Sequence, residues 1–193
     1  MERKRIFINI SRIFLILLFV GISFYFYAYS SPEELVYFIG VENAYLLIFI
    51  LAFIGGITTF SGIPYHLVLI TLATGGLNPI FLGTSTAFGV MLGDTTSYYV
   101  GYQGSAIIPK SFHRILGAIR NFSLKHPKLL PLFFFLYGCM SPFSNDFIVI
   151  SMGLSRYPYW KVIAPLGLGN LVFNISLSYF ATEAYELLKG IFF

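Results

Sequence analysis

Long uncharged, apolar stretches alternate with short polar segments along this chain. Runs without Asp, Glu, Lys or Arg cover residues 13–32, 43–93, 129–145 and 162–182. A helix needs about 20 mostly apolar residues to cross a bilayer. The first and last runs therefore predict one spanning helix each, whereas the 51 residues of 43–93 must hold more than one helical element.

Proline and glycine interrupt two of these runs and predict re-entrant hairpins. The first break lies between Ser61 and Pro64, and the second between Ser141 and Asp146, which includes Pro142. Proline lacks an N–H and disfavours helix in the residue before it, so a helix tends to end at such a site. We expect re-entrant hairpins over 43–77 and 129–155, transmembrane helices over 79–103 and 160–182, and a loop over 104–128.

Charge predicts how these elements are oriented. Four basic residues precede the first apolar run, Glu33, Glu34 and Glu42 follow it, and the loop 104–128 holds five Lys and Arg with no acid. Because cytoplasmic loops are enriched in Lys and Arg, we expect a multi-pass protein of the cell membrane with a cytoplasmic N-terminus. Residues 1–42 would form a signal-anchor helix and outer loop, and 183–193 a tail; cleavage of the first helix stays open.

The two halves share landmarks that predict an inverted repeat. The proline of each break is followed eleven residues later by a glycine, at 64 and 75 and again at 142 and 153. Each following helix carries a polar residue, Asp94 or Asn170. The first hairpin would enter from outside and the second from inside, as in many secondary transporters. We therefore expect an all-α polytopic membrane fold with an inverted-topology repeat; chance recurrence of Gly and Pro is the alternative.

Composition agrees with a membrane protein. Hydrophobic residues make up 57% of the chain and charged residues 10%, and the mean hydropathy is +0.80, whereas soluble domains carry about 25% charged residues. This balance excludes an ordinary soluble enzyme, a disordered chain and a secreted disulfide scaffold. The single cysteine, Cys139, allows no intrachain disulfide. We expect no nucleic-acid partner, cofactor or metal, and a homo-oligomer stays open.

Two carboxylates, Asp94 and Asp146, lie inside the apolar stretches and are the principal candidates for function. Ionisable residues within a span are costly and usually mark a transport path or proton relay. The alternative for Asp146 is a cap on the helix 147–154. The alternative for Asp94 is a carboxylate that reaches the membrane surface and pairs with Arg114 or Lys110.

Further candidates surround the breaks. The His66 imidazole, which changes charge near neutral pH, is either a proton carrier or a structural side chain. The other candidates for the substrate or ion pathway are Ser61, Pro64, Ser141, Pro142, Ser144, Asn145 and Asn170. For Ser61, Ser141, Ser144 and Asn170 the alternative is that they satisfy opened backbone. Lipid headgroups are expected to contact Lys110, Arg114, Arg120 and Arg156. No catalytic constellation or phosphate-binding loop is present in the sequence, so an enzyme is not expected.

Residues 62–64 and the segment from Gly93-Asp94 through Tyr98 to Gly101 resemble the first half of the DedA/VTT family of membrane proteins. Residues 138–161, with the turn Gly-Leu-Ser-Arg-Tyr-Pro, are similar to its second half. The resemblance implies movement of lipids between leaflets, by a flippase or scramblase, in some members linked to proton gradients.

This chain departs from that family at two places. Tyr65 and His66 follow the first proline, where bacterial members usually have an acidic residue, and Cys139 and Asn145 replace two arginines around the second. An arginine clamp for phosphate is therefore missing, and the chain resembles a divergent branch. We expect a lipid transporter whose polar site lies between two opposed hairpins. The alternative is a proton- or ion-coupled carrier of a small solute.

Overall fold

The computed structural model describes residues 31–57, 65–105, 117, 121–122, 125–140 and 144–192. Every regular element in these ranges is helical, as the sequence predicts. The elements are α2 (Pro32–Ile39), α3 (Val41–Ile57), α4 (Tyr65–Thr74), α5 (Pro79–Gly104), α7 (Leu129–Met140), α8 (Asp146–Leu154) and α9 (Trp160–Phe192). The expected N-terminal anchor helix and most of the basic loop lie outside the described residues.

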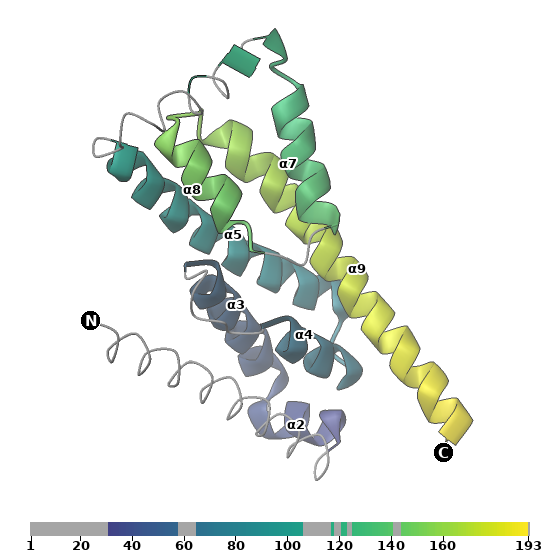
Figure 1. The fold of residues 1–193 in the computed structure, drawn as a ribbon. Helices are drawn as coiled ribbons and strands as arrows, with labels where there is room; N and C mark the ends of the chain where they lie inside the picture. The colour runs from purple at the N-terminus through teal and green to yellow at the C-terminus, as the bar shows by residue number, and fades with distance from the viewer. Residues whose placement is uncertain are drawn as a thin grey trace, which may run out of the picture.

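Two units of three helices make up most of the described fold. Each has a first helix, a break, a short helix, a tight turn and a long helix: α3, α4 and α5 in one unit, α7, α8 and α9 in the other. Figure 1 shows α3 and α7 entering from opposite ends and both ending near the middle, from where α4 and α8 return. The long helices α5 and α9 run antiparallel and pack against each other. The units are thus inverted relative to each other.

Burial repeats along the two units at an offset of 80 residues. Positions 71–100 and 151–180 match one to one as buried, half-buried or exposed, except at 75/155, 93/173 and 97/177. This register corrects the landmarks expected from sequence, because it pairs Asp94 with Asn174 and not with Asn170. The glycines at 75 and 153 are not equivalent either: Gly75 adjoins α2, whereas Gly153 packs on α5.

The short helix of each unit ends in the same turn. Gly76 and Arg156, 80 residues apart, have left-handed φ angles of 88° and 52°. The next residue donates its N–H to the carbonyl five positions earlier, from Leu77 at 3.4 Å and from Tyr157 at 3.0 Å. This is the Schellman motif, which favours glycine. Arg156 adopts the left-handed conformation at a cost of about 1–2 kcal/mol. In the second unit, therefore, the surrounding structure imposes the turn against the preference of the residue.

Equivalent glycines let each long helix approach the first helix of its own unit. A Cβ on Gly89 of α5 would collide with the Phe49 carbonyl of α3. A Cβ on Gly169 of α9, 80 residues later, would collide with the Phe135 carbonyl of α7. Such contacts between backbones are typical of helices packed through small residues. Each unit therefore has the same close contact between its first helix and its long helix.

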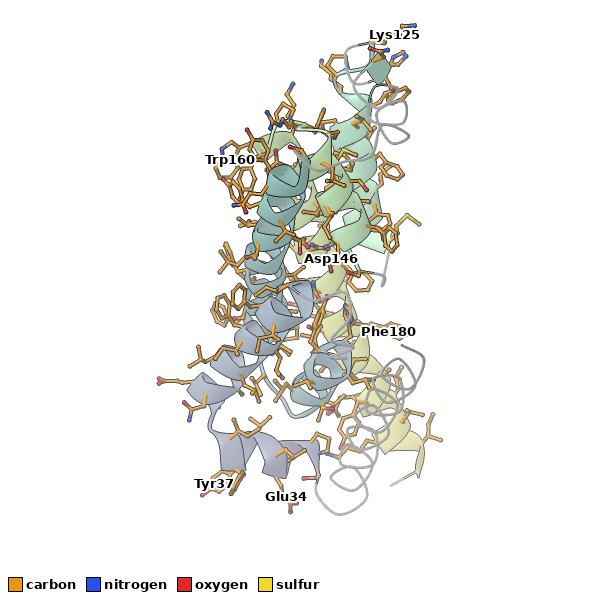
Figure 2. The ribbon with its side chains drawn as sticks, turned by 60° about the vertical axis from the view of Figure 1, so that its left-hand side comes forward. Glu34, Tyr37, Lys125, Asp146, Trp160 and Phe180 are labelled. Carbon is orange, nitrogen blue, oxygen red and sulfur yellow. The ribbon has the colours of Figure 1, made fainter. Side chains whose placement is uncertain are left out.

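One described helix is both long enough and apolar enough to cross a membrane. α9 is apolar enough over Trp160–Ile191 to cross a membrane, and α2 with α3 meets the same criteria only as a pair bent by 96°. α9 continues to Phe192 instead of ending near 182, so the expected tail is helical through residue 192. Figure 2 shows Trp160 and Lys125 toward one end of the molecule, Glu34 and Tyr37 toward the other, and Asp146 between them.

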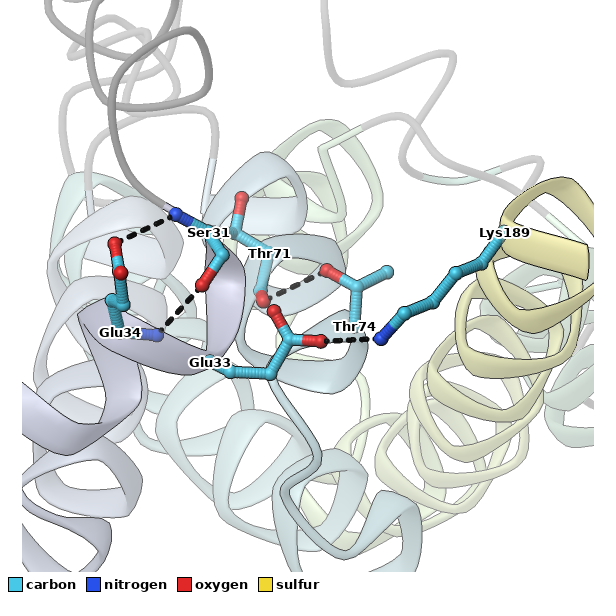
Figure 3. Close-up of polar contacts among 6 residues, drawn as sticks. All are labelled: Ser31, Glu33, Glu34, Thr71, Thr74 and Lys189. Atoms are coloured by element: carbon cyan, nitrogen blue, oxygen red, sulfur yellow. Dashed lines mark hydrogen bonds and ion pairs between the residues drawn. The ribbon is translucent and has the colours of Figure 1, made fainter. Parts of the chain in front are cut away.

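The helix α2 was expected to be part of an outer loop. It starts with a capping box, in which the Glu34 N–H donates to Ser31 Oγ and the Ser31 N–H donates to Glu34 Oε2, both at 3.2 Å. An ion pair of 3.3 Å between Glu33 and Lys189 joins α2 to the end of α9, beside the Thr74–Thr71 contact of α4 (Figure 3). Pro32 and Val36 of α2 pack against Gly75 and so place α2 at the end of the first unit.

Replacing Lys189 with alanine is expected to leave the melting temperature in detergent unchanged within error. Both side chains of the pair are about half exposed, at 52% for Lys189 and 44% for Glu33. Exposed ion pairs contribute little because solvent screens them. A clear drop in melting temperature, measured by thermal unfolding at low and high salt, would show that this contact is a structural anchor.

Candidate functional site

The carboxylates Asp94 and Asp146 lie in the middle of the fold and are almost fully buried. Asp94 on α5 is 2% exposed, and Asp146 at the start of α8 is 1% exposed. Asp94 is in the middle of a 26-residue helix, and Asp146 follows the break of the second hairpin. The two groups are close enough to interact electrostatically. The structure therefore brings together two residues that are 52 positions apart in sequence.

Side chains at the tip of the α7–α8 hairpin bind both carboxylates. Asn145 Nδ2 donates to Asp94 Oδ2 at 2.9 Å, and Ser144 Oγ donates to Asp146 Oδ2 at 2.9 Å. The Tyr137 hydroxyl donates to the Ser144 carbonyl at 3.2 Å and ties the tip to α7. We call Asp94, Ser144, Asn145 and Asp146 the acidic cluster.

These contacts correct both alternatives considered from sequence. Asp146 is the first residue of α8, and the N-cap position belongs to Asn145, whose side chain makes no capping bond. Asp94 does not reach the surface, because it is buried and accepts its bond from Asn145. Both carboxylates are therefore held by the interior of the fold.

Close packing of α8 on α5 positions the cluster. A Cβ on Gly153 of α8 would collide with the Tyr98 carbonyl, and a Cβ on Gly101 of α5 with the Ile150 carbonyl. The first hairpin adds a contact from the other side, where Ser97 Oγ donates to the Gly56 carbonyl at 3.3 Å. Glycine is thus required where the two backbones meet, and this approach brings Asn145 within bonding distance of Asp94.

Other candidates from sequence lie apart from the cluster or outside the described residues. The centroid of the His66 ring on α4 lies 4.0 Å from that of Tyr65 and 5.7 Å from that of Phe173. Arg156 is exposed at the end of the fold, where its Nε donates to Ser105 Oγ at 3.0 Å. The residues that fall outside the described ranges are Ser61, Pro64, Lys110, Arg114, Arg120, Ser141 and Pro142.

Sequence reasoning missed two buried polar residues of α9. Asn174 and Ser178 follow Asn170 at intervals of four on α9 and are 1% and 0% exposed. This spacing places all three on one face of a helix, which was the signal available in the sequence. Tyr65 at the start of α4 lies close enough to interact electrostatically with Asp94. The first hairpin therefore also contributes to the surroundings of the cluster.

An open apolar groove of about 530 Å³ lies between α7 and α8. Six of its lining residues are Leu130, Phe133 and Phe134 of α7 and Phe147, Ile148 and Met152 of α8. Ser151 contributes a hydroxyl to an otherwise apolar lining. Because Phe147 directly follows Asp146, the groove begins at the same hairpin tip that holds the carboxylates.

Comparisons with protein-family models, with curated proteins and with solved structures gave no significant match to this chain.

Proposed function

We propose that this protein is an integral membrane transporter of lipids, which moves headgroups between leaflets past the acidic cluster. The observation that carries the proposal is that one helix, α8, begins with a carboxylate of the buried cluster and then lines the apolar groove that it forms with α7. A lipid has both chemistries, a polar headgroup and apolar chains. A path for lipids needs polar groups at mid-depth and an adjoining apolar surface, and the hairpin tip offers both.

A multi-pass arrangement in the cell membrane is part of this proposal. α5 has 26 residues, which at 1.5 Å per residue corresponds to about 39 Å, longer than the roughly 30 Å hydrocarbon core. Its average hydropathy is lowered by polar side chains that are buried against other helices, Thr86, Asp94 and Ser97. In a bundle such residues do not face lipid, so α5 is suited to cross beside α9.

Opposed hairpins fit a path with a polar interior. Irregular backbone at membrane depth must be buried in protein or line a wet cavity, and α3 and α7 both end near the middle of the fold. With the inverted order of the units, this supports re-entrant hairpins and the resemblance to the DedA/VTT family. Asp94 and Asp146 are the groups we assign to headgroup contact and proton coupling.

Charged side chains at the two ends support the orientation expected from sequence. The basic residues lie where α7 and α9 begin, and they are Lys125, Lys128, Arg156 and Lys161. The acidic residues Glu33, Glu34 and Glu42 lie in α2 and at the start of α3. Lys and Arg are enriched on the cytoplasmic side. In this orientation the first hairpin enters from outside and the second from the cytoplasm, where Arg156 and Lys161 can contact anionic headgroups.

The groove favours a lipid over the alternative, a small solute. A carrier of solutes needs a central site that is sealed from the bilayer, whereas the groove is open and apolar. Filling it should block lipid movement. In vesicles that contain fluorescent phospholipids, the wild-type protein should exchange lipids between leaflets faster than protein-free vesicles, and Ser151→Phe should reduce this exchange about tenfold or more, a barrier increase of about 1.4 kcal/mol.

The matched control for this experiment is Thr96→Phe. Thr96 is an exposed hydroxyl residue on α5 and does not line the groove, so the same change in size should leave exchange at the wild-type rate. Exchange is measured as the fraction of label bleached by an impermeant reductant. Wild-type exchange by correctly folded Ser151→Phe would contradict a lipid path along the groove.

A further inference from the structure

A row of buried polar side chains on α9 lies outside the acidic cluster. Asn170, Asn174 and Ser178 are 6%, 1% and 0% exposed. Asn174 Nδ2 donates to the Asn170 carbonyl, and Ser178 Oγ to the Asn174 carbonyl, both at 2.8 Å. In the described part of the chain, Asn170 Nδ2 and Asn174 Oδ1 are buried and make no hydrogen bond. Buried polar groups in native proteins are nearly always bonded, so this pair of atoms points to a ligand.

One member of this pair, Asn174, is equivalent in position to Asp94 of the acidic cluster, whereas Asn170 corresponds to Val90. Asn174 takes the place of Asp94 in the register of 80 residues, and His66 takes the place of Asp146. α4 packs on α9 as α8 packs on α5, and the His66 ring contacts Phe173 next to Asn174. The repeat therefore places an amide, Asn174, on α9 where α5 carries the carboxylate Asp94.

The two sites are separate along the bundle. A Cβ on Gly83 would lie 2.6 Å from Ile175, and a Cβ on Gly167 would lie 2.8 Å from Met91. In this antiparallel register, position 94 of α5 lies opposite position 164 of α9, ten residues before Asn174. At 1.5 Å per residue, Asn170 lies about 9 Å and Asn174 about 15 Å from Asp94 along the bundle.

We propose that Asn170 and Asn174 form a second binding site that takes a hydroxyl group. The amide Nδ2 of Asn170 donates and the carbonyl Oδ1 of Asn174 accepts, and a single hydroxyl can both accept and donate. Two neutral amides supply no charge for a phosphate or a cation. The hydroxyl is supplied either by a lipid headgroup, an identity that rests on the proposed function, or by water.

Thiol labelling tests this site without measuring transport. The variant Asn174→Cys is made in a cysteine-free background, Cys139→Ala. It is reconstituted in phosphatidylcholine vesicles that contain either phosphatidylglycerol or phosphatidylmethanol. These two lipids carry the same charge, but only phosphatidylglycerol has hydroxyl groups in its headgroup. A small polar thiol reagent should label this cysteine at least tenfold faster than the control Leu166→Cys, which is buried in apolar surroundings of the same helix. Asn170→Cys serves as a second variant if Asn174→Cys fails to fold.

The lipid composition identifies the source of the hydroxyl. Labelling several-fold slower with phosphatidylglycerol than with phosphatidylmethanol would assign the site to a lipid headgroup, and equal, rapid labelling would assign it to water. Labelling of folded Asn174→Cys and Asn170→Cys as slow as that of Leu166→Cys would overturn the second site. Labelling does not require transport, so it tests only the second site. The proposed function fails if the wild-type protein does not exchange lipids between leaflets.

Discussion

Replacing Asp94 with asparagine is expected to reduce lipid exchange between leaflets about tenfold or more, with little loss of folded protein. Asparagine has nearly the same shape, and its side-chain oxygen can still accept the bond that Asn145 Nδ2 gives to Asp94 Oδ2 at 2.9 Å. The change removes only the ionisable group. The exchange rate in reconstituted vesicles, with and without a pH gradient, measures the effect.

Glu42→Gln is the matched control for this prediction. Glu42 is an exposed carboxylate at the start of α3 and lies outside the acidic cluster, so the same chemical change should leave exchange unaltered. Equal amounts of monodisperse protein after purification would show that both variants fold. Wild-type exchange by Asp94→Asn would contradict the functional role of this carboxylate.

Substituting valine for Gly153 is expected to destabilise the protein by about 1–3 kcal/mol, the usual cost of overpacking. A side chain at this position would collide with the Tyr98 carbonyl of α5, so α8 must move away. That movement also separates Asn145 from Asp94, and lipid exchange should fall with stability. Thermal unfolding in detergent measures the first effect and the vesicle assay the second.

Gly190→Ala tests whether this effect is specific to the contact. A Cβ on Gly190 meets no atom within 4 Å, and alanine in an exposed helix is favoured over glycine by about 0.5–1 kcal/mol. This control should unfold at the same or a slightly higher temperature and exchange lipids normally. Equal behaviour of the two variants would show that α8 does not need its close approach to α5.

The pattern of apolar runs and breaks predicted the order of helices well. The expected hairpin over 43–77 and the expected helix over 79–103 correspond closely to α3 with α4 and to α5, because breaks and helix lengths are local properties. α2 was overlooked although its capping box, Ser31 and Glu34, is visible in the sequence. Its short length and its place between two apolar runs concealed it.

The internal register could not be derived from Gly and Pro landmarks. Spacing aligned Gly75 with Gly153, an offset of 78, whereas burial repeats at 80. The two glycines serve different contacts, with α2 and with α5, so their matched spacing is not evidence of equivalence. The register depends on which side chains are buried between helices, and only the packed structure reveals this.

The acidic cluster was predicted only as separate residues. The absence of other charges from the apolar runs singled out Asp94 and Asp146, since an isolated charge in such a run is a local signal. The bond from Asn145 to Asp94 joins residues 51 positions apart and depends on the glycine contacts of α5 and α8. Tertiary packing of this kind has no local signature in the sequence.

The most direct test of the lipid path follows two markers in the same vesicles, a fluorescent phospholipid and a trapped water-soluble dye. Purified wild-type protein is reconstituted at about one copy per vesicle, and bleaching of the lipid and escape of the dye are recorded together. If the protein provides a path for lipids, nearly all the lipid label becomes accessible while the dye stays inside. Lipid bleaching that stops at the level of protein-free vesicles would contradict such a path.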